Sequence, residues 1–108
     1  MTPAELGRLL AELPGVAEGS SYGTPAWRLR RRLLARLQED GRTLVLRVDP
    51  NRREQLLASR PDLFHLTEHY RHHPYVLVVL PMITMDELRP LLTEAVAAAA
   101  RRGRHAVS

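Results

Sequence analysis

The chain has 108 residues, 44% of them apolar, which fits one domain with its own hydrophobic core. It contains no cysteine, which excludes a disulfide framework, a thiolate zinc site and a cysteine nucleophile. The net charge is +4 and every basic residue apart from histidine is Arg; residues 21–60 alone carry ten Arg against four acidic residues, so the positive charge is local.

The N-terminal segment predicts a capped helix followed by a loop. Thr2 can cap, Pro3 suits the first helical position and Glu5 completes a capping box. Leucines then recur at helical spacing until Pro14-Gly15 ends the helix. Residues 19–25 are rich in Gly, Ser and Thr, which favours a loop.

Residues 27–48 predict three strands in an antiparallel meander. Apolar and polar residues alternate over 27–29, 33–37 and 44–48, as in half-buried strands. Arg31-Arg32 is the expected first turn, and Asp40-Gly41 is a strong hairpin signal.

The remaining residues predict a helix, two strands and a last helix. Asp49 and Pro50 open a helix that Arg60-Pro61 ends. Residues 63–66 form a short apolar segment, 67–74 a polar loop and 75–80 a well-covered strand. A second capping box at Thr84 begins a helix with an apolar stripe. We therefore expect a two-layer α+β domain over 1–100, in the order α-β-β-β-α-β-β-α, with a C-terminal tail over 101–108. Its antiparallel sheet should pack on the first and last helices.

Several local strings, in this order and spacing, resemble the MmcQ/YjbR family over residues 3 to about 100. They are Leu13-Pro14-Gly15-Val16 with Glu18, Tyr22-Gly23-Thr24-Pro25-Ala26-Trp27-Arg28-Leu29, Val48-Asp49-Pro50, Glu68-His69-Tyr70 and Asp86-Glu87-Leu88. The resemblance implies a two-layer α+β fold similar to secretion chaperones. This family is often described as DNA-binding, with a "double-wing" motif, so the resemblance also implies DNA binding.

An Arg cluster is the main candidate site. Strand alternation places four Arg side chains on the sheet face opposite the apolar one: Arg28, Arg30, Arg36 and Arg47. With Arg31 and Arg32 they form the predicted nucleic-acid-binding set, because guanidinium groups are planar, bidentate donors to phosphate. We expect the four-residue face to be exposed and contiguous. The alternative is a solvated face without a function.

No residue pattern predicts catalysis, a cofactor or a metal. Four histidines lie between His65 and His73, but they match no zinc-ligand spacing and fall on an expected strand and loop, so a polar surface loop is favoured. Ser20 and Ser21 lie in no nucleophile elbow, and the glycines match no nucleotide fingerprint.

Tyr22, Trp27, His69 and Tyr70 are candidates for a shallow groove, although Trp27 is better explained as the largest core residue. The sequence thus predicts a binding protein rather than an enzyme. The first hypothesis is weak electrostatic DNA binding, and the alternative is a protein-interaction or chaperone-like module. The longest apolar runs, 76–80 and 95–100, are too short to cross a bilayer, and no signal-peptide pattern is present. We therefore expect a cytoplasmic protein with no membrane partner.

Overall fold

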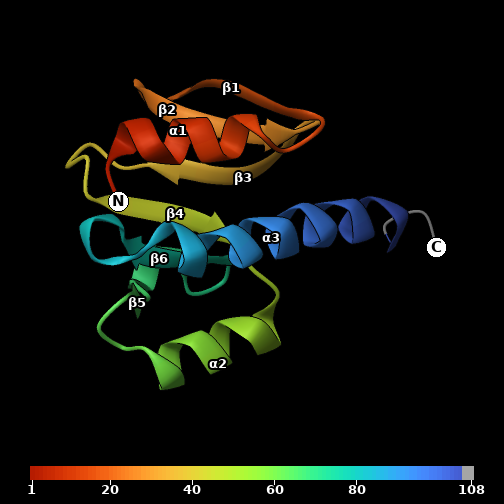
Figure 1. The fold of residues 1–108 in the computed structure, drawn as a ribbon. Helices are drawn as coiled ribbons and strands as arrows, with labels where there is room; N and C mark the ends of the chain where they lie inside the picture. The colour runs from red at the N-terminus through yellow and green to blue at the C-terminus, as the bar shows by residue number, and fades with distance from the viewer. Residues whose placement is uncertain (106–108) are drawn as a thin grey trace.

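A computed structural model describes residues 1–105 and the side chains of residues 1–101, and it has the predicted α+β class (Figure 1). The helices are α1 (Pro3–Ala11), α2 (Pro50–Ser59) and α3 (Met85–His105). The strands are β1 (Val16–Ser21), β2 (Thr24–Leu29), β3 (Arg32–Leu37), β4 (Thr43–Arg47), β5 (Phe64–His65) and β6 (Tyr75–Val79). Two 3-10 turns, η1 (Glu68–Tyr70) and η2 (Leu80–Met82), lie on either side of β6.

Helices α1 and α3 begin at the two predicted capping boxes. In α1, Thr2 Oγ1 accepts from the Glu5 amide at 3.2 Å, and Glu5 Oε1 accepts from the Thr2 amide at 2.8 Å. Thr84 and Glu87 repeat this exchange at the start of α3, at 3.1 and 3.0 Å. Two backbone donors at each helix start are satisfied in this way, so the sequence itself defines where both helices begin.

The strands form one antiparallel sheet in the order β1-β2-β3-β4-β6-β5. The first four strands are a meander, and the hairpins at either end of β2 have two-residue turns at 22–23 and 30–31. Strand β6 lies inside the sheet, between β4 and β5, which agrees with its apolar character on both faces. The edges of the sheet are therefore β1 and the very short β5.

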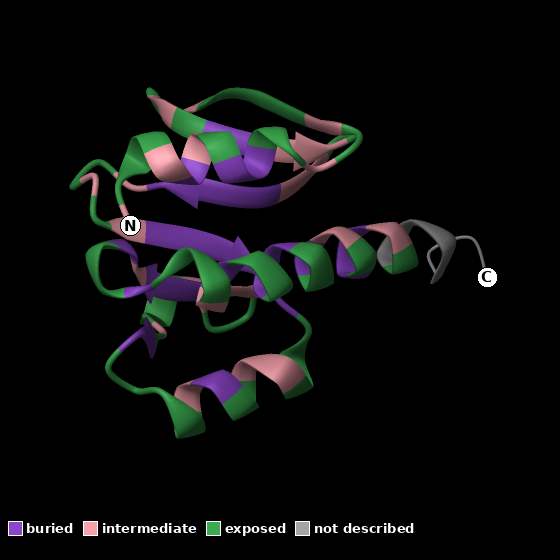
Figure 2. Cartoon of the chain, viewed as in Figure 1, coloured by how far each residue is buried: buried purple, intermediate pink, exposed green. Residues whose placement is uncertain are grey.

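Helices α1 and α3 cover one face of the sheet, and α2 lies beside its β5 edge (Figure 1). The strand register aligns a row of apolar residues under the two helices: Trp27, Ala35, Leu46 and Val76. They share one core with leucines of α1 and α3, including Leu6, Leu10, Leu88 and Leu92. Figure 2 shows this burial on β3, β4 and the inner sides of both helices, while β1 is exposed over most of its length.

Several local details differ from the sequence-based expectation, and three of them concern β1, α2 and α3. Strand β1 occupies part of the region that was expected to be a loop, so an additional strand precedes the three predicted ones. Asp49 precedes α2 as expected, but its carboxylate pairs with Arg101 and makes no cap hydrogen bond. Helix α3 continues to His105, into the segment expected to be a tail, and residues 106–108 lie outside the described part.

A bulge in the β2–β3 pairing changes the alternation of side chains. The register shifts between Trp27 and Arg28, so that Arg28 lies opposite Leu33 while Trp27 lies opposite Ala35. Leu34, the extra residue on β3, joins the buried core, and Leu33 does not. The strict alternation expected for residues 33–37 is therefore wrong at its beginning, because a bulge places two residues opposite one.

Candidate functional site

The sheet face opposite α1 and α3 carries Arg36 and Arg47, as the alternation predicts. Arg36 lies beside Ala26 and Val45, and Arg47 beside Tyr75, in the antiparallel register. Directly opposed residues of antiparallel strands share a face. The expectation that these Arg side chains are exposed is nevertheless wrong, because Arg36 is only 8% and Arg47 only 6% exposed.

Arg36 is buried because aromatic and polar groups surround its guanidinium. Its Nη1 donates to Thr24 Oγ1 at 3.2 Å and to Glu39 Oε1 at 3.5 Å. Its Nη2 donates to Tyr70 Oη at 3.3 Å, and the Tyr22 ring lies 5.5 Å from the guanidinium carbon. Burial alone lowers the pKa of Arg36, but the hydrogen bond to Tyr70 and the charge of Glu39 outweigh it, so the pKa is raised. Arg36 is a permanent, internally bound cation.

Arg47 is bound to the protein in a similar way. Its Nε donates to the Leu33 carbonyl at 2.7 Å, and its Nη2 donates to Tyr75 Oη at 3.3 Å. The guanidinium also lies 5.3 Å from the centre of the Tyr75 ring. Its partners include a backbone carbonyl and a tyrosine, and its burial leaves little of this side chain for an external phosphate.

Together these contacts form a continuous row across the sheet face, which we call the Arg–Tyr row: Tyr22, Arg36, Tyr70, Tyr75 and Arg47. The Tyr70 and Tyr75 rings meet edge to face at 6.0 Å and connect the two Arg sites. The segment between β5 and β6 contributes Tyr70 and so covers part of this face.

The candidate groove residues separate onto the two faces of the sheet. Tyr22 and Tyr70 belong to the Arg–Tyr row, and His69 packs edge to face on Tyr70 with ring centres 4.7 Å apart. Trp27 is 3% exposed and lies in the core under the helices. The groove therefore does not include Trp27, and its interpretation as a core residue is correct.

The exposed Arg side chains gather on the β2–β3 hairpin. Arg30 and Arg31 form its turn and are exposed, and Arg28 and Arg32 flank them half-buried. The expected turn at Arg31-Arg32 is therefore wrong by one residue, because β3 begins at Arg32, and Arg30 lies in the turn instead of on the sheet face. None of these four side chains, which we call the Arg hairpin, makes an ion pair or hydrogen bond with another residue of the described part. Arg52, Arg60 and Arg89, by contrast, all pair with carboxylates.

The backbone of the Arg hairpin is strained at Arg30. This residue has a φ of 59°, in the left-handed region that favours glycine. That conformation costs an L-residue with a side chain about 1–2 kcal/mol. Arg30 therefore lowers the stability of the turn relative to glycine. In exchange, its position places a charged side chain at the tip of the turn.

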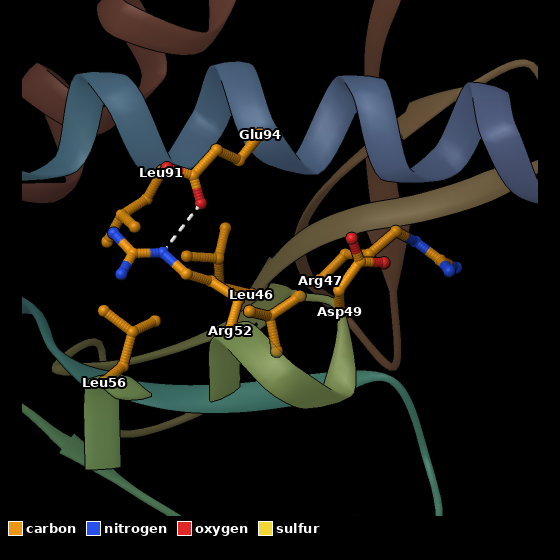
Figure 3. A pocket seen from close by; sticks show the side chains of 8 residues that line it. Leu46, Arg47, Asp49, Arg52, Leu56, Leu91 and Glu94 are labelled. Atoms are coloured by element: carbon orange, nitrogen blue, oxygen red, sulfur yellow. Dashed lines mark hydrogen bonds and ion pairs between the residues drawn. The ribbon is translucent and has the colours of Figure 1, made fainter. Parts of the chain in front are cut away.

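The pocket between α2 and α3 is small (Figure 3). Its apolar lining includes Leu46, Leu56 and Leu91, and Arg52 reaches across it to Glu94, with Nε 3.0 Å from Oε1. Its volume of about 20 Å³ is comparable to one water molecule, which excludes an organic ligand.

A second, open hollow of about 270 Å³ lies beside the start of α2, between that helix and the 67–74 segment. Its lining consists of Pro50, Arg53, Arg71, His72, His73 and Pro74. The Arg53 guanidinium donates to the backbone carbonyls of residues 70, 71, 73 and 75. Its donors are therefore used by the protein itself. The sequence does not predict this role of Arg53, because every residue has a backbone carbonyl and no side-chain pattern identifies the ones that accept its hydrogen bonds.

The histidine-rich segment forms no recognisable metal centre in the described part of the chain. His69 and His73 lie with ring centres 6.1 Å apart. Among the described side chains, no three His, Cys, Asp or Glu residues gather in a way that could hold an ion. The absence of a bound metal stays a prediction. Within the same residues, no helix is both long and apolar enough to span a bilayer.

Comparisons with known proteins agree with this fold. The family model named YjbR matches residues 11–96. The crystal structure of Deinococcus radiodurans protein DR2400, described by the family-model domain DUF419, is similar with a TM-score of 0.77 and 25% sequence identity. The similarity covers 94% of this chain and 80% of that one. No curated protein matches the sequence. The match of the family model over most of its length shows that the chain belongs to the YjbR family.

Proposed function

We propose that the protein is a non-catalytic binding protein that holds DNA weakly, through phosphate contacts and without sequence specificity. The observation that carries the proposal is the Arg hairpin, whose four cationic side chains have no anionic partner in the described part of the chain. Guanidinium groups without internal partners are free to bind phosphate in bidentate geometry. They hold a charge but do not transfer protons, which favours binding over catalysis.

The binding surface that we propose is smaller than the predicted Arg set. Arg36 and Arg47 stabilise the Arg–Tyr row, so they contribute positive potential but few direct contacts. Four neutralised phosphates predict a log–log salt slope of about −3 to −4. Affinity should lie in the non-specific range of about 10⁻⁴ to 10⁻⁶ M at physiological salt. We propose a cytoplasmic location for this activity.

Fluorescence anisotropy with two unrelated labelled duplexes, each titrated at several salt concentrations, tests the proposal. Replacing Arg30 and Arg31 by Ala should reduce the salt slope by about two and weaken both duplexes alike. The matched control replaces Arg8 and Arg42, two exposed Arg side chains outside the hairpin, and removes the same net charge. Equal effects of the two double variants, or no binding at low salt, would exclude the Arg hairpin as the site.

One observation favours the alternative, a protein-interaction or chaperone-like module. Strand β1 is an edge of the sheet, and its residues 17–20 are all exposed. An open edge can pair with an extended segment of another protein through backbone hydrogen bonds. If the duplex titrations show no binding, this alternative becomes the better account.

A further inference from the structure

We propose that Tyr22 is a stacking platform for an unpaired nucleobase, so that the preferred ligand is single-stranded nucleic acid. This inference rests on the proposed function and adds to it a second contact of a different chemistry. It assigns the base contact to the β1–β2 turn and the phosphate contacts to the Arg hairpin.

Tyr22 is presented to solvent in a way that its backbone does not favour. It is 88% exposed, which makes it the most exposed of the large hydrophobic side chains that the structure describes. It forms a two-residue turn with Gly23, and both residues have positive φ, 55° and 79°. Such a turn is preferred by Asn, Asp and Gly, not by an aromatic residue. Backbone strain at an exposed aromatic residue suggests a functional reason for its presence.

The Tyr22 ring lies over a buried cation, Arg36. Arg36 lies with its guanidinium carbon 5.5 Å from the centre of the ring, and Thr24 and Tyr70 fix that guanidinium by hydrogen bonds. One side of the ring therefore contacts a buried cation. Because the side chain is 88% exposed, most of the remaining ring surface faces solvent.

Arg28 of the Arg hairpin lies on the same side of the sheet as the Tyr22 ring, whereas Arg32, which pairs with the core-packed Leu29, lies on the helix side. Arg28 and Thr24 alternate along β2 with Trp27, and Thr24 hydrogen-bonds to Arg36 on the face away from the helices. The six residues of β2 extend over about 20 Å, at about 3.3 Å per residue. A short single strand lying along β2 can reach Tyr22 at one end and Arg28 with the turn residues Arg30 and Arg31 at the other.

A single strand fits this arrangement better than a duplex. Bases in a duplex are paired and stacked on one another, so a tyrosine outside the helix cannot stack on them without disrupting a pair. Unpaired bases stack on exposed aromatic side chains, and each such contact is independent of sequence because every base has a π-face. A positively charged surface with an aromatic platform is a common arrangement in proteins that bind single strands.

The test uses three labelled ligands of equal length: an oligothymidine strand, an abasic strand with the same phosphates, and a duplex. Tyr22→Asn keeps a residue that tolerates the turn and removes the ring. It should weaken oligothymidine binding by about 5- to 150-fold, the range for one lost base stack. Its salt slope and its duplex affinity should not change. The unaltered protein should bind the abasic strand about as weakly as the Tyr22→Asn variant binds oligothymidine.

Tyr22→Trp is the rescue variant, because an indole ring also stacks on bases. It should bind oligothymidine like the unaltered protein, and the fluorescence of the introduced indole should be quenched on binding. Oligothymidine binding that is unchanged by Tyr22→Asn, or an abasic strand that binds as tightly as oligothymidine, would overturn the inference. In that case a continued loss of binding in the Arg30 and Arg31 double variant would leave the proposed phosphate contacts intact. No binding of any ligand would refute both proposals.

Discussion

Replacing Arg53 by Met should destabilise the fold more than any other single change on the surface of α2. The Arg53 Nη1 donates to three carbonyls, those of His73 at 2.7 Å, Tyr75 at 3.1 Å and Tyr70 at 3.5 Å. Its Nη2 donates to the carbonyl of Arg71 at 3.1 Å. One side chain therefore connects α2 to the whole segment that covers the Arg–Tyr row.

The expected loss follows from these contacts. A hydrogen bond from a charged donor contributes about 1.5–3 kcal/mol, and the side chain is only half-buried, so water replaces part of the loss. We expect the free energy of unfolding to fall by about 2–4 kcal/mol in Arg53→Met. For a domain of this size that corresponds to a decrease in Tm of about 10–25 °C.

Urea unfolding followed by circular dichroism measures the effect, and the same helix provides the control. Arg52→Met removes an exposed ion pair with Glu94 and should cost no more than about 1 kcal/mol. Arg53→Lys keeps the charge but loses the planar fork, so it should lie between the two. If Arg53→Met and Arg52→Met unfold at the same urea concentration, the carbonyl contacts contribute nothing and the reasoning is wrong.

Three further predictions concern the turns and the pH dependence. Arg30→Gly should raise the free energy of unfolding by about 1 kcal/mol in urea titrations, because glycine relieves the positive φ, and should also weaken DNA binding. Gly15→Ala should lower it, by about 1 kcal/mol or more, since φ is 80° and the added Cβ would lie 3.2 Å from a methyl of Leu29. The pKa of Glu87 is below its ordinary value of 4.5, first because its carboxylate accepts a hydrogen bond from the Thr84 amide and then because it accepts one from Arg60. Its stabilising effect is therefore fully present above pH 4.5 and is lost as the pH falls through the lower folded-state value, and Glu87→Gln should show a smaller loss of stability in acid titrations.

The sequence predicts those parts of the fold that depend on local chemistry. Both capping boxes, the Asp40-Gly41 turn and the alternation along β4 are short-range patterns, and the structure confirms them. Strand β1 was missed because Gly and Ser are poor strand formers, and its pairing with β2 overrides that preference. Gly23 as the second residue of a two-residue turn was the available signal for this hairpin.

The burial of Arg36 and Arg47 could not be predicted from the local sequence. Alternation gives the correct face for Arg36 and Arg47, but it cannot show that Tyr70, 34 residues later than Arg36, folds over that face. Burial of an Arg depends on such a distant partner, and a tyrosine in a polar loop does not reveal it. The Arg hairpin was predictable as a group because its four residues are neighbours in the chain.

The position of Trp27 has a practical consequence. It is the single tryptophan of the chain, and it lies in the core on the side of the sheet opposite Tyr22 and the Arg–Tyr row. Its emission should therefore be blue-shifted in the folded protein and move to longer wavelength when the core opens. A ligand on the opposite face would not touch the indole. Intrinsic fluorescence and an extrinsic label on the nucleic acid can thus follow unfolding and binding as separate signals in one sample.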